Sequence, residues 1–139
     1  MPNNRRNRGR RAGTVAIELL FVLPLLLSLL FGMIEFSLFL AARQQVTTAS
    51  REGARVAALG GTEAEVQQAV AQFLGAGNLG NATAQVTFIP QAGLPATSGD
   101  AVQVVVSLPV SQAVPDLLAF IGVSLQNQNI VASTVMRKE

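Results

Sequence analysis

Two carboxylates in an otherwise apolar stretch are the residues of this sequence best suited to a specific chemical contact. Glu18 and Glu35 enclose a run without any charged residue, filled mostly by Leu, Phe, Val, Ile and Met. A carboxylate that faces lipid is costly, so its side chain is expected either to reach water at a membrane surface or to lie beside a cationic or polar partner. The chemistry open to these two residues is ion pairing where screening is weak.

Catalytic chemistry has no comparable support. The sequence lacks Cys and His, which excludes disulfides, thiol chemistry, Cys/His zinc sites and His-dependent triads. Asp100 and Asp116 occur in turn or helix-cap contexts, and the Gly-rich segment 75–81 lacks the Lys-Ser/Thr pair of a phosphate-binding loop. We therefore predict no catalytic residues, no metal site, no cofactor and no enzymatic activity.

The apolar run predicts a membrane-spanning helix at residues 14–42. A helix from Glu18 to Glu35 rises about 25 Å, close to the ~30 Å hydrocarbon core of a bilayer. It has no polar face, which a core helix of a small soluble domain would need. Membrane lipid is therefore expected as a direct partner of this chain.

Four residues of this helix are candidates for contact with another helix. Pro24 removes one backbone hydrogen bond and predicts a bend. Ser28 and Gly32 are small residues one turn apart, as in packed transmembrane helices. Glu35 lies near the outer end of the run, where the sequence supports both a side chain that reaches water and a contact with a partner helix.

The positive charge is concentrated before the helix. Residues 1–13 contain five arginines and no acid, whereas the rest of the chain has five basic residues against all eight acidic ones. Because basic residues flank the cytoplasmic side of membrane helices, we expect residues 1–13 to be a cytoplasmic basic leader and residues 43–139 to lie across the membrane. The arginines are not interleaved with aromatic residues, so nucleic acid is not an expected partner.

The junction between leader and helix resembles that of a type IV pilin precursor. In such precursors a short basic leader ends in Gly and is cut at the cytoplasmic face by a prepilin peptidase, and the fifth mature residue is Glu. Here Gly13 is followed by Thr14, and Glu18 occupies the fifth position from Thr14. The resemblance implies cleavage after Gly13 and a role for Glu18 in docking subunits during assembly. The new amino group of Thr14 would then lie one helical turn from Glu18.

A wider pattern is similar to the TadE family of tight-adherence (Flp, type IVb) pseudopilins. It comprises GTVAIELLFVLPLLL at 13–27, GMIEF at 32–36, the segment 42–58 and the closing segment 132–139. This resemblance implies a pseudopilin or minor pilin of the inner membrane that has no enzymatic activity. Such a subunit is either incorporated in a pilus or located at its base. Its implied partners are the prepilin peptidase, the inner-membrane assembly platform, the major pilin and other pseudopilins.

The N-terminal segment has two other interpretations. A secretory signal peptide fits poorly, because the apolar run is too long and Leu40-Ala41-Ala42 is not a small-x-small cleavage site. An uncleaved single-pass membrane anchor with an outer binding domain is the alternative hypothesis, in which Glu18 only reaches toward water. The mass of the mature chain distinguishes the anchor from the pseudopilin.

Residues 43–139 predict one small α+β, pilin-like domain. The long helix should continue through 43–59 and end at Gly60-Gly61, and a capping box at 62–65 begins a second helix that ends at Gly75. Alternating apolar residues predict strands around 84–88, 102–108 and 130–136, hence an antiparallel sheet of about three strands. Segment 115–122 predicts a short apolar helix, placed either toward the membrane or over the sheet edge.

Overall fold

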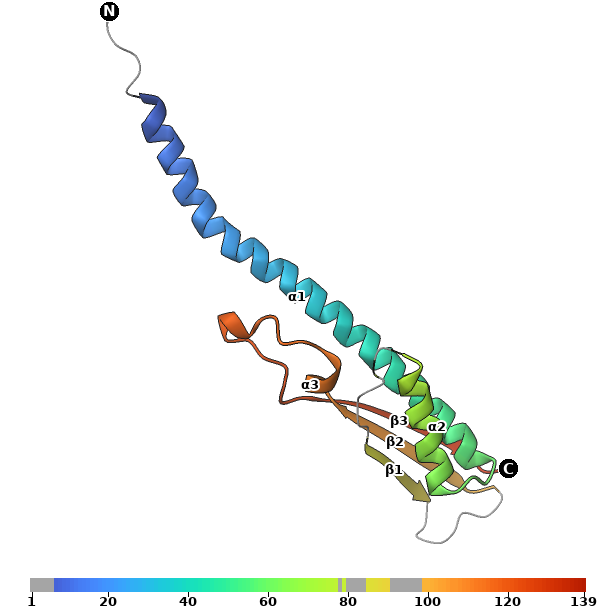
Figure 1. Cartoon of the computed structure of the whole chain (residues 1–139). Helices are drawn as coiled ribbons and strands as arrows, with labels where there is room; N and C mark the ends of the chain where they lie inside the picture. Colours follow the sequence, from blue (N-terminus) through green and yellow to red (C-terminus); the bar gives the residue numbers. More distant parts are fainter. Residues whose placement is uncertain (1–6, 78, 80–84, 91–98) are drawn as a thin grey trace, which may run out of the picture.

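One helix runs through more than a third of the chain. The computed structural model describes residues 7–77, 79, 85–90 and 99–139, with the side chains of 7–14 and 88–90 excepted. Helix α1 (Asn7–Ala58) comprises 52 residues, and Figure 1 shows it projecting far beyond the rest of the molecule. The predicted continuity between the apolar run and the segment after Arg43 is confirmed.

The apolar part of α1 is not a core helix. An 18-residue window of this helix has a mean hydropathy of 2.5, and none of that window is buried. Phe21 and Leu25 are 76% and 70% exposed. By length and composition the helix can cross a membrane, and its apolar surface is available to lipid along its N-terminal half. The segment fits a membrane anchor.

Glycine ends α1 where the sequence predicts. Gly60 has φ 88°, a left-handed conformation that side chains rarely adopt, and its N–H donates to the Ala57 carbonyl at 3.1 Å. The next residue, Gly61, donates to the Val56 carbonyl at 3.0 Å. The chain therefore reverses tightly and starts a second helix antiparallel to the first.

Helix α2 (Glu63–Gly75) begins with the predicted capping box. The Thr62 N–H donates to Glu65 Oε2 at 2.7 Å, and the Glu65 N–H donates to Thr62 Oγ1 at 3.4 Å. These reciprocal bonds satisfy two donors that a helix start would otherwise leave unpaired. The apolar stripe of α2 packs onto the core through Val66, Val70 and Leu74, which are all buried.

Three strands form an antiparallel meander of order β1-β2-β3, as expected for the α+β class. They are β1 (Gln85–Pro90), β2 (Ala101–Pro109) and β3 (Asn129–Arg137). The register pairs Val86 with Val106 and Val104 with Thr134. In β2 alternate residues are buried, namely Val102, Val104, Val106 and Leu108. The predicted start of the first strand at Ala84 lies outside the described residues.

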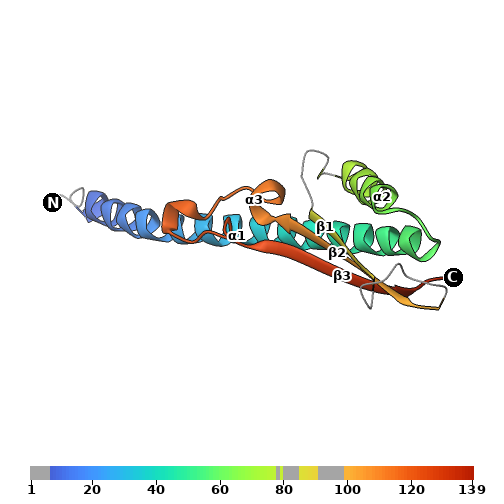
Figure 2. The same ribbon diagram turned by 90° about the horizontal axis from the view of Figure 1, so that it is seen from below.

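The core lies between the sheet and the C-terminal half of α1. Figures 1 and 2 show that half of α1 running along the sheet with α2 beside it. Small residues allow the close approach: Val46, Ala49 and Ala57 are at most 1% exposed, and Gly53 is buried. Ser50 is also fully buried, and its Oγ lies 3.2 Å from the Val104 carbonyl and 2.9 Å from Thr134 Oγ1. The hydroxyl thus joins α1 to strands β2 and β3.

The segment between β2 and β3 differs from the predicted single helix over 115–122. It contains the one-turn helix α3 (Val110–Ala113), then a loop of residues 114–128 that holds the 3₁₀ turn η1 (Ala119–Ile121). Val114 is extended, as residues before proline usually are, so helical structure stops before Pro115. Gly122, with φ 81°, ends the 3₁₀ turn. Residues 114–128 are called the α3–β3 loop below.

Candidate functional site

The candidate processing and docking residues lie at the free end of α1. Gly13 and Thr14 belong to the helix, and the Thr14 side chain is outside the described part. Glu18 is exposed, and among the described side chains none forms a hydrogen bond or ion pair with it. An exposed carboxylate on an otherwise apolar surface is available for contact with a cationic group of another molecule, or with the Thr14 amino group after cleavage.

Pro24 lies inside α1, and proline cannot donate a hydrogen bond to the preceding turn. Figure 1 shows that the blue part of the helix curves. The Ser28 hydroxyl donates to the Pro24 carbonyl at 2.7 Å, so its polar group is satisfied within the same helix. These two residues therefore shape the helix without requiring a polar partner in lipid.

Gly32 contacts the α3–β3 loop. A Cβ atom built on Gly32 would lie 3.8 Å from Leu118 Cδ1, an ordinary van der Waals distance. One residue earlier, Phe31 meets Phe120 edge to face, with ring centroids 6.1 Å apart and planes at 86°. Aromatic pairs favour this geometry. The loop thus reaches down the long helix and packs on the helix face that contains Gly32.

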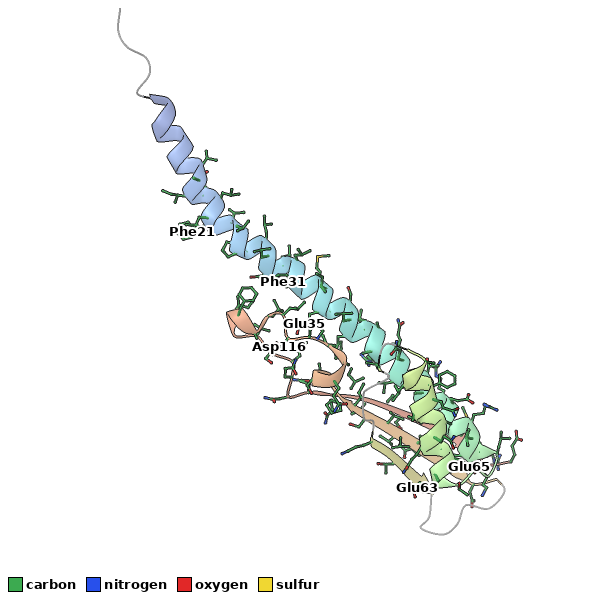
Figure 3. The ribbon with its side chains drawn as sticks, in the orientation of Figure 1. Phe21, Phe31, Glu35, Glu63, Glu65 and Asp116 are labelled. Atoms are coloured by element: carbon green, nitrogen blue, oxygen red, sulfur yellow. The ribbon has the colours of Figure 1, made fainter. Side chains whose placement is uncertain are left out.

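Glu35 is buried rather than exposed. Its side chain is on the same part of α1, and the residue is only 3% exposed. Figure 3 shows Glu35 and Asp116 in the region between α1 and the α3–β3 loop. Neither Glu35 Oε2 nor Asp116 Oδ1 has a hydrogen-bond partner among the described residues, although Asp116 Oδ2 accepts from the Ser124 hydroxyl at 2.7 Å. The loop therefore keeps an acidic group of the long helix away from its surroundings.

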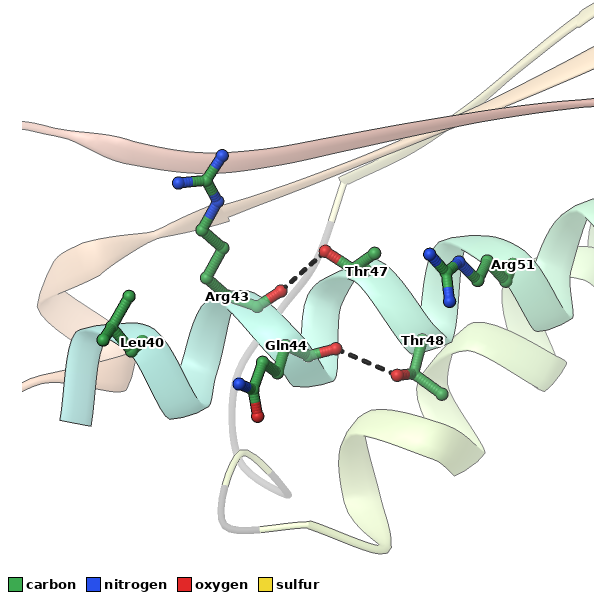
Figure 4. Close-up of a pocket in the computed structure, with 6 residues that line it drawn as sticks. All are labelled: Leu40, Arg43, Gln44, Thr47, Thr48 and Arg51. Atoms are coloured by element: carbon green, nitrogen blue, oxygen red, sulfur yellow. Dashed lines mark hydrogen bonds between the residues drawn. The ribbon is translucent and has the colours of Figure 1, made fainter. Parts of the chain in front are cut away.

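A polar, basic surface follows directly after the apolar part of α1. Figure 4 shows a shallow hollow lined by Leu40, Arg43, Gln44, Thr47, Thr48 and Arg51. The Thr47 and Thr48 hydroxyls donate to the carbonyls four residues earlier, at 2.8 and 3.0 Å. The two arginines are exposed, so the hollow can accept an anionic group such as a carboxylate of a neighbouring protein.

The exposed charges and the apolar surface of α1 are suited to contacts with another molecule. Within the described side chains, no three acidic groups come close enough together to hold a metal ion. Exposed charged groups flank the apolar segment: Glu18 lies near one end, and Arg43 and Arg51 lie beyond the other. A long apolar helix with a carboxylate at one end and basic groups at the other is suited to lateral packing in an assembly.

Sequence reasoning did not identify the loop residues that meet the long helix. Leu118 and Phe120 approach Gly32 and Phe31 although some 90 positions separate them in the sequence. The sequence predicts an apolar segment here, placed either toward the membrane or over the sheet edge. The sequence alone does not determine which residues of α1 this loop contacts. That depends on the length of β2 along the helix.

Comparison with known proteins supports the resemblance noted in the sequence. Residues 13–55 match the model of the family described as TadE-like protein. This N-terminal region is therefore similar to the TadE-like family. No curated protein matches the chain. No solved structure matches it either.

Proposed function

We propose that this chain is a pseudopilin or minor pilin of a tight-adherence pilus, made as a precursor and cut after Gly13 by a prepilin peptidase. The observation that carries the proposal is the TadE-like match, which begins at Gly13 and includes Thr14 and Glu18. The exposed apolar surface of α1 supports it, because such a helix can leave the bilayer only by packing against other helices.

In this proposal residues 1–13 are the cytoplasmic leader, 14–42 the transmembrane helix and 43–139 the periplasmic or extracellular domain. The inner membrane holds the chain before assembly. Its partners are the peptidase, the assembly platform, the major pilin and other pseudopilins. The role is structural, and the chain's own residues supply packing and charge rather than catalysis.

Glu18 is proposed to guide docking. In the isolated chain its carboxylate is exposed and has no partner among the described side chains. Cleavage would create an amino group on Thr14, one turn away or on a neighbouring subunit, where low dielectric strengthens the attraction. The candidate contact residues Pro24, Ser28 and Gly32 would set the shape of the adjacent helix surface, while Glu35 stays under the loop.

The test of this function replaces Glu18 with Gln, which keeps the size and removes the charge. Because the chain has no Cys, a single Leu25→Cys substitution on the exposed helix surface provides a unique crosslinking site. We expect Glu18→Gln to be inserted and cut at normal levels, yet to lose crosslinks to pilus components and to abolish piliation. Glu63→Gln, an exposed substitution on α2, is the matched control and should retain both.

Normal piliation by the Glu18→Gln variant would contradict the proposed docking role and favour the uncleaved anchor with an outer binding domain. Topology is tested separately. Protease added to the cytoplasmic face of inverted vesicles should leave residues 43–139 protected, because the five arginines retain the N-terminus in the cytoplasm. Digestion of this domain would refute the orientation.

A further inference from the structure

The α3–β3 loop carries apolar side chains that the described chain leaves about half exposed. Phe120, Ile121 and Val123 are 59%, 49% and 48% exposed. They cluster around one turn, and Figures 1 and 2 both show this turn beside α1, far from the centre of the sheet. Such a cluster is expensive in water. The position of this apolar cluster along α1 indicates whether it lies in water or in lipid.

The aromatic contact fixes that position. Phe120 meets Phe31, and Phe31 precedes Glu35 by one helical turn, about 6 Å along the axis. It lies about 20 Å beyond Glu18, whereas the hydrocarbon core is ~30 Å thick. A membrane that encloses the apolar part of α1 from Glu18 onward therefore also encloses the level of Phe31, and with it the side chain of Phe120.

The loop is built to tolerate this position. The N–H groups of Ile121, Gly122 and Val123 donate to carbonyls of Leu118 and Ala119, at 3.0, 3.0 and 3.3 Å. Three backbone donors at the tip are thus paired within the turn, which lowers the cost of placing this backbone in hydrocarbon.

The two sides of the loop also differ. Leu118 packs over Gly32, close to the buried Glu35, while Phe120, Ile121 and Val123 remain about half exposed. The Ser124 hydroxyl donates to Asp116 Oδ2 at 2.7 Å, which ties the two ends of this segment together. The surface that the tip presents to its surroundings is therefore apolar.

We propose that the tip of the α3–β3 loop is a second membrane-contacting element, inserted among lipid acyl chains of the leaflet opposite the N-terminus. The occupant is lipid because the loop continues the exposed apolar surface of α1 at the same depth. Such an insertion would fix the domain against the membrane surface at a second point and shield Glu35 from lipid. This inference rests on α1 spanning the membrane.

Single tryptophans test the inference, because the chain contains no Trp. Phe120→Trp and Ile121→Trp report on the loop, Phe21→Trp reports on the spanning helix, and Val135→Trp reports on the outer face of β3, where Val135 is 56% exposed. Each full-length variant is reconstituted at a high lipid-to-protein ratio into phosphatidylcholine vesicles, with and without bromine on the acyl chains, and aqueous iodide is applied in parallel.

We expect bromolipid to quench the Phe21→Trp, Phe120→Trp and Ile121→Trp variants several-fold more strongly than Val135→Trp, and iodide to give the reverse order. Ile121→Trp reports on the same loop while leaving the contact between Phe120 and Phe31 unchanged. Quenching at 21 but not at 120 and 121 would overturn the loop insertion and leave the membrane anchor intact. Absence of bromolipid quenching at 21 would overturn both.

Shielding of positions 120 and 121 from both quenchers would mean that a second copy of the chain covers the loop. That result would also overturn insertion into lipid.

Discussion

The close contact of α1 with α2 and the sheet predicts that a single methyl group at Gly53 destabilises the domain. A Cβ atom at Gly53 would lie 2.8 Å from Val70 Cγ2, 3.3 Å from Val104 Cγ1 and 3.5 Å from Val66 Cγ1. All three valines are at most 1% exposed, and β-branched side chains in a packed core cannot rotate aside cheaply.

The size of the effect follows from two opposing terms. Overpacking of a core costs about 1–3 kcal/mol, whereas replacing Gly by Ala within a helix gains about 1 kcal/mol. Gly75→Ala is the matched control, because a Cβ on Gly75, in the last turn of α2, meets no atom within 4 Å. Gly53→Ala should therefore be less stable than Gly75→Ala by about 1–3 kcal/mol.

Hydrogen exchange of the β2 amides in the detergent-solubilised full chain measures this difference, since a central strand exchanges through opening of the whole domain. Exchange should be faster in Gly53→Ala than in Gly75→Ala, by about tenfold for every 1.4 kcal/mol. Equal protection in the two variants would refute the packing of α1 against α2 and β2 described above.

Three further predictions concern the same domain. Ser50→Ala should lower the free energy of unfolding by about 1 kcal/mol, because it removes the buried partner of Thr134; urea titration measures the loss. Gly60→Ala should also destabilise the domain, by about 1 kcal/mol, because φ 88° is unfavourable for a residue with a side chain. The control variant Gly75→Ala should not destabilise it. The pKa of Glu65 is lowered, first by the Thr62 backbone N–H and then by its hydroxyl, so its stabilising contribution is present above the unfolded pKa and lost as pH falls through the folded pKa. The thermal midpoint of the wild type should therefore exceed that of Glu65→Gln at neutral pH, and the two midpoints should converge in acid. A difference between the midpoints that stays constant down to about pH 3 would contradict this.

Much of the architecture follows from local sequence signals. The apolar run, the glycine pair after α1 and the capping box at Thr62 each define a helix boundary through backbone chemistry that operates over a few residues. The alternation from Val102 to Leu108 identifies the central strand, since period two on a half-buried sheet sorts residues to opposite faces.

The environment of Glu35 could not be predicted in this way. Its burial depends on the α3–β3 loop reaching Gly32, and that reach depends on the length of β2 and on Pro115 ending helical structure. These are tertiary relations among distant segments, which no local pattern encodes. Ser50 was missed for the same reason, because a lone serine on a helix reveals its partners only once the sheet is in place.

The proposal that this chain is a processed pseudopilin is tested most directly by the intact mass of the protein extracted from the membranes of its own host. The predicted result is a chain that begins at Thr14 and lacks residues 1–13, while a Gly13 variant with a bulky side chain accumulates uncut. A membrane-bound chain that retains residues 1–13 would contradict the proposal and leave the single-pass anchor in its place.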